Sequence, residues 1–185
     1  MATFKILLGI FCLGAVGGHS MLNRPAVAPG ADAEARAKVL HIARQELGVR
    51  ECGGNNTGIR IASYLRYAGV KNPAPWCAAY VSWVFGQAGF KQPRSPWSPA
   101  LFPKERQIAL PLPASVFGIY FPELKRIGHC GLVERQAGIW LITLEGNTNI
   151  AGSREGDGVY RKRRLLKRVS CLADWLAQKG GKHEK

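Results

Sequence analysis

The chain has 185 residues, a formal net charge of +14 at pH 7 and a hydrophobic fraction of 46%. The length favours one globular domain whose core is stable without disulfides or a structural metal, and the composition excludes a disordered chain. The excess of positive charge disfavours basic partners. It favours polyanions such as cell-wall polymers, anionic lipid surfaces or nucleic acid.

The first 20 residues have the features of an export signal. Lys5 supplies one positive charge, and the apolar stretch ILLGIFCLGAVGG that follows it is short for a membrane span. We expect residues 1–20 to be a signal peptide or an N-terminal anchor, and the protein to be periplasmic, envelope-bound or extracellular. Residues 21–31, rich in Pro, Gly and Ala, are expected to be a linker, and residues 179–185 a disordered tail.

The first half of the remaining domain, residues 32–178, has helical periodicity. Asp32 is a good N-cap, and apolar residues at helical spacing follow it until Gly48. A second, short helix is expected over Ile59–Tyr67. A third is predicted over residues 76–87, directly after two prolines, and it should be buried because it is apolar nearly all round.

The second half changes to the pattern of β-strands. Residues 92–113 hold six of the eleven prolines and are expected to be irregular. Four β-rich runs follow, separated by Gly-containing turns: VFGIYF, HCGLVE, IWLITLEG and VYRKRRL. Ser170 is expected to cap a last amphipathic helix with Leu172, Trp175 and Leu176. Helices before strands indicate an α+β fold.

Cys77 begins the third predicted helix and is the candidate nucleophile. Unpaired N–H groups and the partial positive charge of a helix N-terminus stabilise a thiolate. A thiolate needs a proton acceptor for acyl transfer, and His129, at the start of a predicted strand, is better placed than the other histidines. Glu145 ends the next strand, where antiparallel pairing can bring it beside His129 as the orienting acceptor, and Asn147 can add a second polar group.

Each of these residues also has a structural interpretation. A buried cysteine is most often a small core residue, a histidine is often satisfied within the core or at the surface, and a carboxylate at a strand end is often solvated. The residues taken alone leave both interpretations open.

Three sequence motifs resemble those of one enzyme family. PWCAAYVSWVF resembles the nucleophile motif of the CHAP family, the cysteine- and histidine-dependent amidohydrolases and peptidases. GHCGLVE resembles its histidine strand, and LEGNTN the segment after it. ARQELGVRECGGNNTGIRIASYLRYAG resembles the helix-loop-helix that precedes the cysteine in one subgroup, so that the similarity runs from about Lys38 to Thr148.

The resemblance implies a papain-like fold, with N-terminal helices packed on an antiparallel sheet. It implies Cys77 as nucleophile, His129 as base, Glu145 as histidine orienter and Asn147 as an auxiliary polar group. The activity implied is cleavage of the peptide stem or crossbridge of peptidoglycan, or of the amide that joins stem to sugar. No cofactor is implied.

Two departures from the family pattern stand out. A Gly-Asp pair usually precedes the strand before the histidine, but the matching stretch here is Pro-Ala-Ser-Val-Phe, and Cys130 replaces a usual apolar residue. Without Cys12 of the export signal, four cysteines remain, and they cannot all pair if one stays a free thiolate. No C-x-x-C or H-x-x-H pair exists, so no metal site is expected.

The run Arg161–Lys162–Arg163–Arg164 is either a solvated edge strand or a surface that adheres to an anionic wall. Nucleic-acid binding ranks third, because no nucleic-acid motif accompanies the run. Glu51, Asn56 and Trp76 are candidates for lining the substrate cleft, while a cap or turn role is equally open for Glu51 and Asn56.

The leading hypothesis is therefore a monomeric, exported peptidoglycan amidase or endopeptidase, whose partner is peptidoglycan or another anionic wall polymer. It binds no specific nucleic acid, and no membrane unless the N-terminal segment is retained. The alternatives are a noncatalytic wall-binding protein on a hydrolase scaffold and a basic nucleic-acid-binding protein.

Overall fold

The computed structural model describes residues 29–150 and 155–177, with side chains from residue 32 onward. The expected signal or anchor at residues 1–20 and the expected tail at 179–185 lie outside the described residues, as does most of the expected linker. Within these ranges no helix is long and apolar enough to cross a membrane.

Three α-helices form the first half: α1 (Pro29–Gln45), α2 (Ile59–Tyr67) and α3 (Cys77–Gln87). The predicted second and third helices are confirmed. The predicted start of the first helix at Asp32 is wrong, since α1 begins three residues earlier, within the expected linker. Asp32 therefore lies in the first turn, where its negative charge interacts favourably with the positive end of the helix dipole. Its carboxylate also accepts a hydrogen bond from Arg36, one turn later in the helix, at 2.9 Å.

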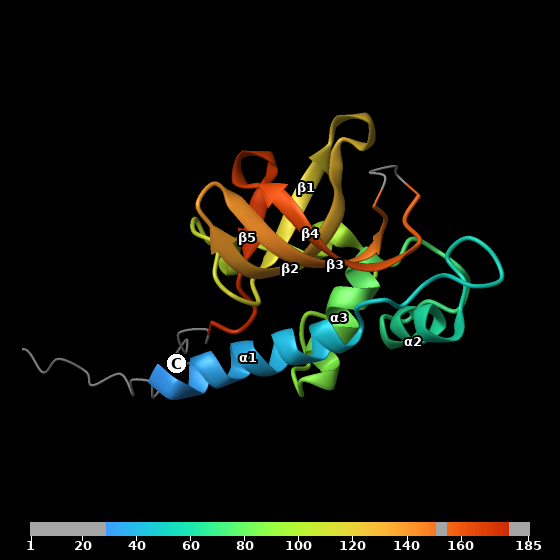
Figure 1. The fold of residues 1–185 in the computed structure, drawn as a ribbon, viewed down its shortest axis with the longest axis horizontal. Coiled ribbons are helices and arrows are strands. Elements are labelled where there is room, and N and C mark those ends of the chain that lie inside the picture. The colour runs from blue at the N-terminus through green and yellow to red at the C-terminus, as the bar shows by residue number, and fades with distance from the viewer. Residues whose placement is uncertain (1–28, 151–154, 178–185) are drawn as a thin grey trace, which may run out of the picture.

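The second half forms one antiparallel sheet. Its strands are β1 (Val116–Phe121), β2 (Arg126–Ala137), β3 (Trp140–Thr148), β4 (Gly158–Leu165) and β5 (Cys171–Ala173), in the order β4-β3-β2-β1-β5. The four predicted strands are thus present. Figure 1 shows the three helices together below this sheet, with α3 between α1 and the strands. The predicted α+β class, with N-terminal helices packed on an antiparallel sheet, is confirmed.

The predicted last helix after Ser170 is wrong, because the chain there forms β5. Leu172 pairs with Phe117 of β1, which would otherwise be the edge of the sheet. The next residue after the strand, Asp174, is buried and forms an ion pair with Arg36 of α1 at 2.7 Å. Strand pairing on one side and the ion pair on the other hold this segment extended.

The sheet separates two apolar clusters. The main core lies between the helices and the sheet, and it contains α3 together with Cys130, Leu132 and Leu144. A smaller cluster contains Phe117, Val133, Leu141 and Leu172. Successive residues of a strand point to opposite faces, so Leu132 and Val133 belong to different clusters. Nine residues of α3, Cys77 to Phe85, are buried, as its apolar sequence predicts.

α3 approaches the sheet closely at Gly146 of β3. A Cβ atom at this position would lie 2.7 Å from both Trp76 and Tyr80, whose side chains are fully buried. Trp76 directly precedes α3 and Tyr80 lies in its first turns, so the absence of a side chain at position 146 determines how near Cys77 lies to the sheet.

We predict that Gly146→Ala destabilises the protein by about 1–3 kcal/mol, the usual cost of overpacking a rigid core. It should also lower the reactivity of Cys77, because relief of the clash moves the N-terminus of α3 away from the strands. Denaturant unfolding and iodoacetamide labelling of the native protein measure the two effects. An Ala variant with unchanged unfolding midpoint and unchanged labelling would contradict this description of the contact.

Candidate active site

Cys77 is the first residue of α3 and is 6% exposed. Trp76, at the N-cap position, makes no side-chain capping hydrogen bond. The free N–H groups of the first turn and the helix dipole therefore act on whatever anion lies at this end of the helix. Cys77, as the first helical residue, lies within this turn.

Ser98 and Cys130 lie against the sulfur of Cys77. Ser98 Oγ is 3.3 Å from Cys77 Sγ and 3.8 Å from Cys130 Sγ. Ser98 was not predicted from the sequence, because it lies in the proline-rich irregular segment, at the start of the 3-10 helix Ser98–Leu101, where no spacing marks it. Cys130 stands out in the sequence only as a departure from the family pattern.

The two neighbouring thiols differ in acidity. A hydrogen bond from Cys130 holds the pKa of the Cys77 thiol well below its ordinary value, although burial opposes this, and His129 and Ser98 act in the same direction. Burial raises the pKa of Cys130 well above its ordinary value. Cys77 is therefore the more acidic of the two, and Cys130 stays a thiol.

His129 of β2 is held by Glu145 of β3. His129 Nε2 lies 2.8 Å from Glu145 Oε2, and both side chains are buried. With Nε2 used in this way, Nδ1 remains for Cys77. Burial alone would lower the pKa of His129, but its interactions with Cys77 and Glu145 raise it to about 9. The predicted proximity of Glu145 to His129 is confirmed.

The carboxylate of Glu145 has two further donors. Thr143 Oγ1 donates to Oε1 at 2.6 Å, and Arg164 of β4 donates to both carboxylate oxygens. Burial would raise the pKa of Glu145, but hydrogen bonds from Arg164 and His129 lower it to about 2. Gly131 provides the space for this side chain, since a Cβ there would lie 2.9 Å from Glu145 Cγ.

The other predicted site residues lie outside this hydrogen-bonded group. Asn147 has a left-handed backbone, with φ of 53°, and within the described residues no hydrogen bond joins its side chain to His129 or Cys77. Its auxiliary role stays a prediction. Glu51 accepts hydrogen bonds from Trp76 Nε1 and from the backbone N–H of Asn56, each at 2.8 Å.

The carboxylate of Glu51 therefore links the backbone of the turn at Asn56 to Trp76, at the N-terminus of α3. Trp76 is fully buried, so its ring offers no surface to a substrate. Among the described residues no group of three or more His, Cys, Asp or Glu side chains is placed to hold a metal ion. None of the four described cysteines forms a disulfide.

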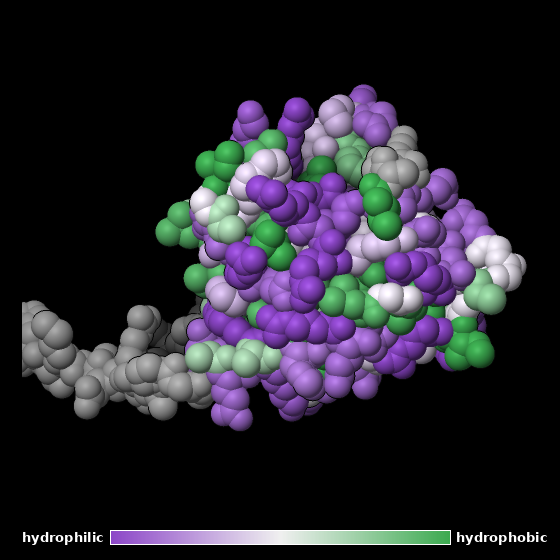
Figure 2. Space-filling view, viewed as in Figure 1, coloured by the Kyte–Doolittle hydropathy of each residue, from purple (hydrophilic) through white to green (hydrophobic). Residues whose placement is uncertain are grey.

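The basic run lies on β4, which is an edge strand as one interpretation predicted. Its cations are partly neutralised, because Arg161 forms an ion pair with Glu134 and Arg164 with Glu145. Arg163 lies over the ring of Trp140. The run is thus a structural element of the sheet as much as a free cationic surface. Figure 2 shows one face of the molecule as mostly hydrophilic, with hydrophobic residues only in small scattered groups.

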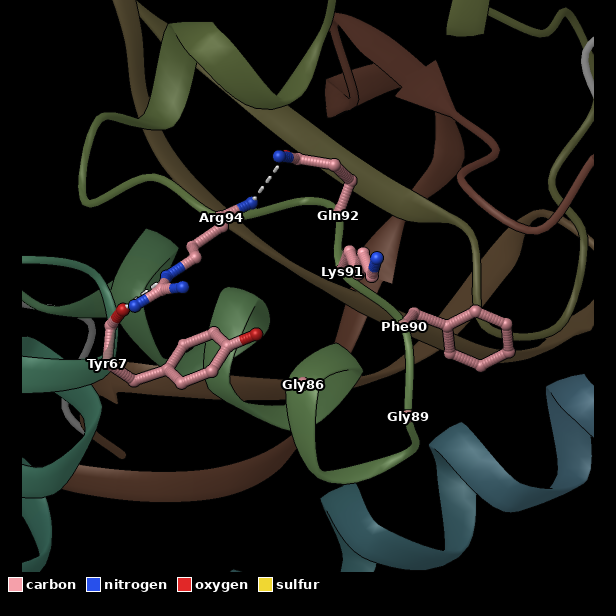
Figure 3. Close-up of a pocket in the computed structure, with 7 residues that line it drawn as sticks. All are labelled: Tyr67, Gly86, Gly89, Phe90, Lys91, Gln92 and Arg94. Carbon is pink, nitrogen blue, oxygen red and sulfur yellow. Dashed lines mark hydrogen bonds between the residues drawn. The ribbon is translucent and has the colours of Figure 1, made fainter.

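A separate cavity of about 500 Å³ lies at the opposite end of α3 from Cys77. Figure 3 shows Arg94 beside Gln92, with its guanidinium group reaching toward Tyr67. Arg94 Nε donates to the backbone oxygen of Tyr67 at 2.9 Å. This cavity shares no residue with the group around Cys77.

No family model matches the chain, and no curated protein matches it. Among solved structures, the chain is similar to that of the peptidoglycan hydrolase RipB from Mycobacterium tuberculosis, with 16% sequence identity and a TM-score of 0.46. The match covers 80% of this chain and 68% of that chain. A similarity this low assigns no function.

We predict that Cys130→Val moves the ionisation of Cys77 to higher pH, because the valine cannot donate a hydrogen bond to the thiolate. The rate of alkylation by iodoacetamide, followed by peptide mapping from pH 4 to 9, should show a raised midpoint. At a pH below both midpoints, a midpoint that is one pH unit higher lowers the alkylation rate about tenfold. Cys171→Val, at a half-buried thiol in β5, is the matched control and should leave the midpoint unchanged. Equal midpoints in both variants would refute the role of Cys130.

Proposed function

We propose that the protein is an exported hydrolase that cuts amide or peptide bonds of peptidoglycan through the thiolate of Cys77. The observation that supports this most directly is the buried hydrogen bond between His129 and Glu145, next to a cysteine at a helix N-terminus. A nucleophile, a base and a group that orients the base are the parts that acyl transfer requires.

In this mechanism the thiolate of Cys77 attacks the carbonyl carbon of the scissile bond. The free N–H groups of the first turn of α3 are suited to stabilise the negative charge that develops on the carbonyl oxygen. His129, as the imidazolium, donates a proton to the leaving amine, and a thioester forms. The neutral imidazole then takes a proton from water, which attacks the thioester and releases the acid.

Glu145 contributes without reacting. Its bond to Nε2 fixes the ring direction of His129 and the tautomer that leaves Nδ1 toward the sulfur. Its negative charge favours the imidazolium over the neutral ring. A pKa of about 9 for His129 means that the ring is protonated near neutral pH, the state needed for donation to the leaving group.

The choice of peptidoglycan rests on the sequence motifs and on charge. The three motifs around Cys77, His129 and Glu145 resemble those of CHAP enzymes, and a net charge of +14 suits a wall that carries carboxylates and other anions. Because Arg161 and Arg164 are paired within the protein, attraction to the wall depends on other exposed cations, such as Lys167 and Arg168 of the 3-10 helix Leu166–Arg168.

We predict that Cys77→Ala and His129→Ala each lower the digestion of purified peptidoglycan by on the order of a thousandfold or more, since removal of a reacting group disables the whole set. Mass spectrometry of the released fragments measures the loss and identifies the bond that is cut. Cys171→Ala is the control for loss of a thiol outside the site and should digest the wall like the wild type.

Digestion at the wild-type rate by either active-site variant would exclude this mechanism. Binding of the wild-type protein to peptidoglycan without any released fragment, unchanged in Cys77→Ala, would instead favour a noncatalytic wall-binding protein.

A further inference from the structure

Glu145 has more partners than an orienter of histidine requires. Its side chain is fully buried and accepts hydrogen bonds from His129, Thr143 and Arg164. Arg164 forms a fork, with Nε 2.8 Å from Oε1 and Nη2 2.5 Å from Oε2. A forked, charge-assisted arginine pair is stronger than a neutral hydrogen bond and fixes the geometry of the carboxylate.

The formal charges around Cys77 show what the fork achieves. With a thiolate at Cys77, an imidazolium at His129 and a carboxylate at Glu145, the buried group carries a net charge of −1. Arg164 brings this sum to zero. An uncompensated charge in a buried site is costly, and the group avoids the cost by taking up a proton. Either Cys77 or Glu145 would then lose its charge.

The balance also holds in the thioester stage of the proposed mechanism. There Cys77 is esterified and His129 is neutral, so that Glu145 and Arg164 are the two remaining charges and cancel each other. With Arg164 the net charge of the buried group is therefore zero in both halves of the cycle. Without Arg164 it would be −1 in both.

We propose that Arg164 is a positioning residue of the active site: it neutralises Glu145 so that a thiolate at Cys77 and an imidazolium at His129 coexist beside an ionised carboxylate. Its catalytic consequence rests on the proposed function, but its effect on the ionisation of Cys77 does not. This gives the basic run on β4 a role in the active site in addition to any role at the surface.

The same strand provides a matched arginine. Arg161 forms an equivalent fork on Glu134, with Nε 2.7 Å from Oε2 and Nη2 3.0 Å from Oε1. Glu134 also pairs with Arg44 of α1, and no hydrogen bond or ion pair joins it to the group around Cys77 in the described part of the chain. Loss of Arg161 thus removes a fork and a charge from β4 without touching Glu145.

The direction of the pH effect follows from the charges that surround Glu145. The titratable or charged groups near it, on the strands and helix packed against it, are His129, Cys130, Cys77, Tyr80, Tyr160, Lys162 and Arg164. Among these cations Arg164 alone donates to both carboxylate oxygens. Removal of its positive charge raises the pKa of both acids, Glu145 and Cys77, so the thiolate and its ionised orienter appear together only at higher pH.

The test compares Arg164→Gln, Arg164→Lys and Arg161→Gln with the wild type. Two profiles are measured against pH: alkylation of Cys77 by iodoacetamide, which needs no substrate, and kcat/KM for peptidoglycan digestion. In Arg164→Gln the acidic limb of both profiles should move up by about one pH unit or more. In Arg161→Gln it should not move, even if thermal unfolding shows equal destabilisation.

Arg164→Lys separates charge from geometry. Lysine keeps the positive charge but not the fork, so the acidic limb should stay near that of the wild type while kcat falls. An acidic limb that is the same in Arg164→Gln, Arg161→Gln and the wild type would overturn the proposal. If Arg164→Gln does not fold, a raised limb in Arg164→Lys would overturn it instead. Persistent wall digestion by Cys77→Ala would end the proposed function, yet the alkylation profiles would still decide the role of Arg164.

Discussion

A fully buried carboxylate, Glu145, is the constraint on which much of the sheet depends. A charge in this position is stable only if every oxygen is paired, and the partners come from different strands: His129 from β2, Thr143 from β3 and Arg164 from β4. A shift of one residue in the register of any of these strands would turn its side chain to the other face. The electrostatics of one residue therefore help to specify the pairing of three strands. Gly131 completes the arrangement, because a larger residue beside Glu145 would displace it.

The helix that carries Cys77, α3, packs against the sheet on the side of the main core. Gly146 follows Glu145 in β3 and faces the opposite side of the sheet. Because it has no side chain, Trp76 and Tyr80 pack directly on β3. Two consecutive residues of β3 therefore fix the active site: Gly146 sets how closely α3 packs on the sheet, and Glu145 orients His129. The thiolate of Cys77 is then stabilised from several directions, by the helix N-terminus, by His129 and by the thiol of Cys130. Stabilisation from separate elements means that the reactive state exists only in the folded protein.

The sequence predicts those features that depend on local pattern. The apolar run after Pro75 predicts a buried helix that begins near Cys77. The β-rich runs HCGLVE and IWLITLEG predict two neighbouring strands, whose antiparallel pairing can bring His129 and Glu145 together. The α+β class follows from the same patterns. For the basic run the sequence leaves two interpretations open, and the position of β4 agrees with one of them, an edge strand whose charge protects against pairing.

Features that depend on contacts between distant segments could not be predicted in this way. The segment after Ser170 has the composition of a helix and becomes a strand because β1 and Arg36 hold it extended. Ser98 lies in a segment without periodicity, and Arg164 is one of four adjacent basic residues, so its partner is known only from the register of β4. Sequence could place Glu145 near His129, but it could not show that an arginine lies behind Glu145.

The central claim is that His129 shares a buried charge pair with Glu145, and titration of His129 by NMR of histidine-labelled protein tests it most directly. The resonance is assigned by its absence in His129→Ala, which also separates it from the other histidines. The account predicts that His129 loses its proton only as the pH rises through about 9, well above the ordinary value near 6.5, and that Glu145→Gln lowers this midpoint. A midpoint at or below about 6.5 in the wild type, or one that Glu145→Gln leaves unchanged, would contradict the account.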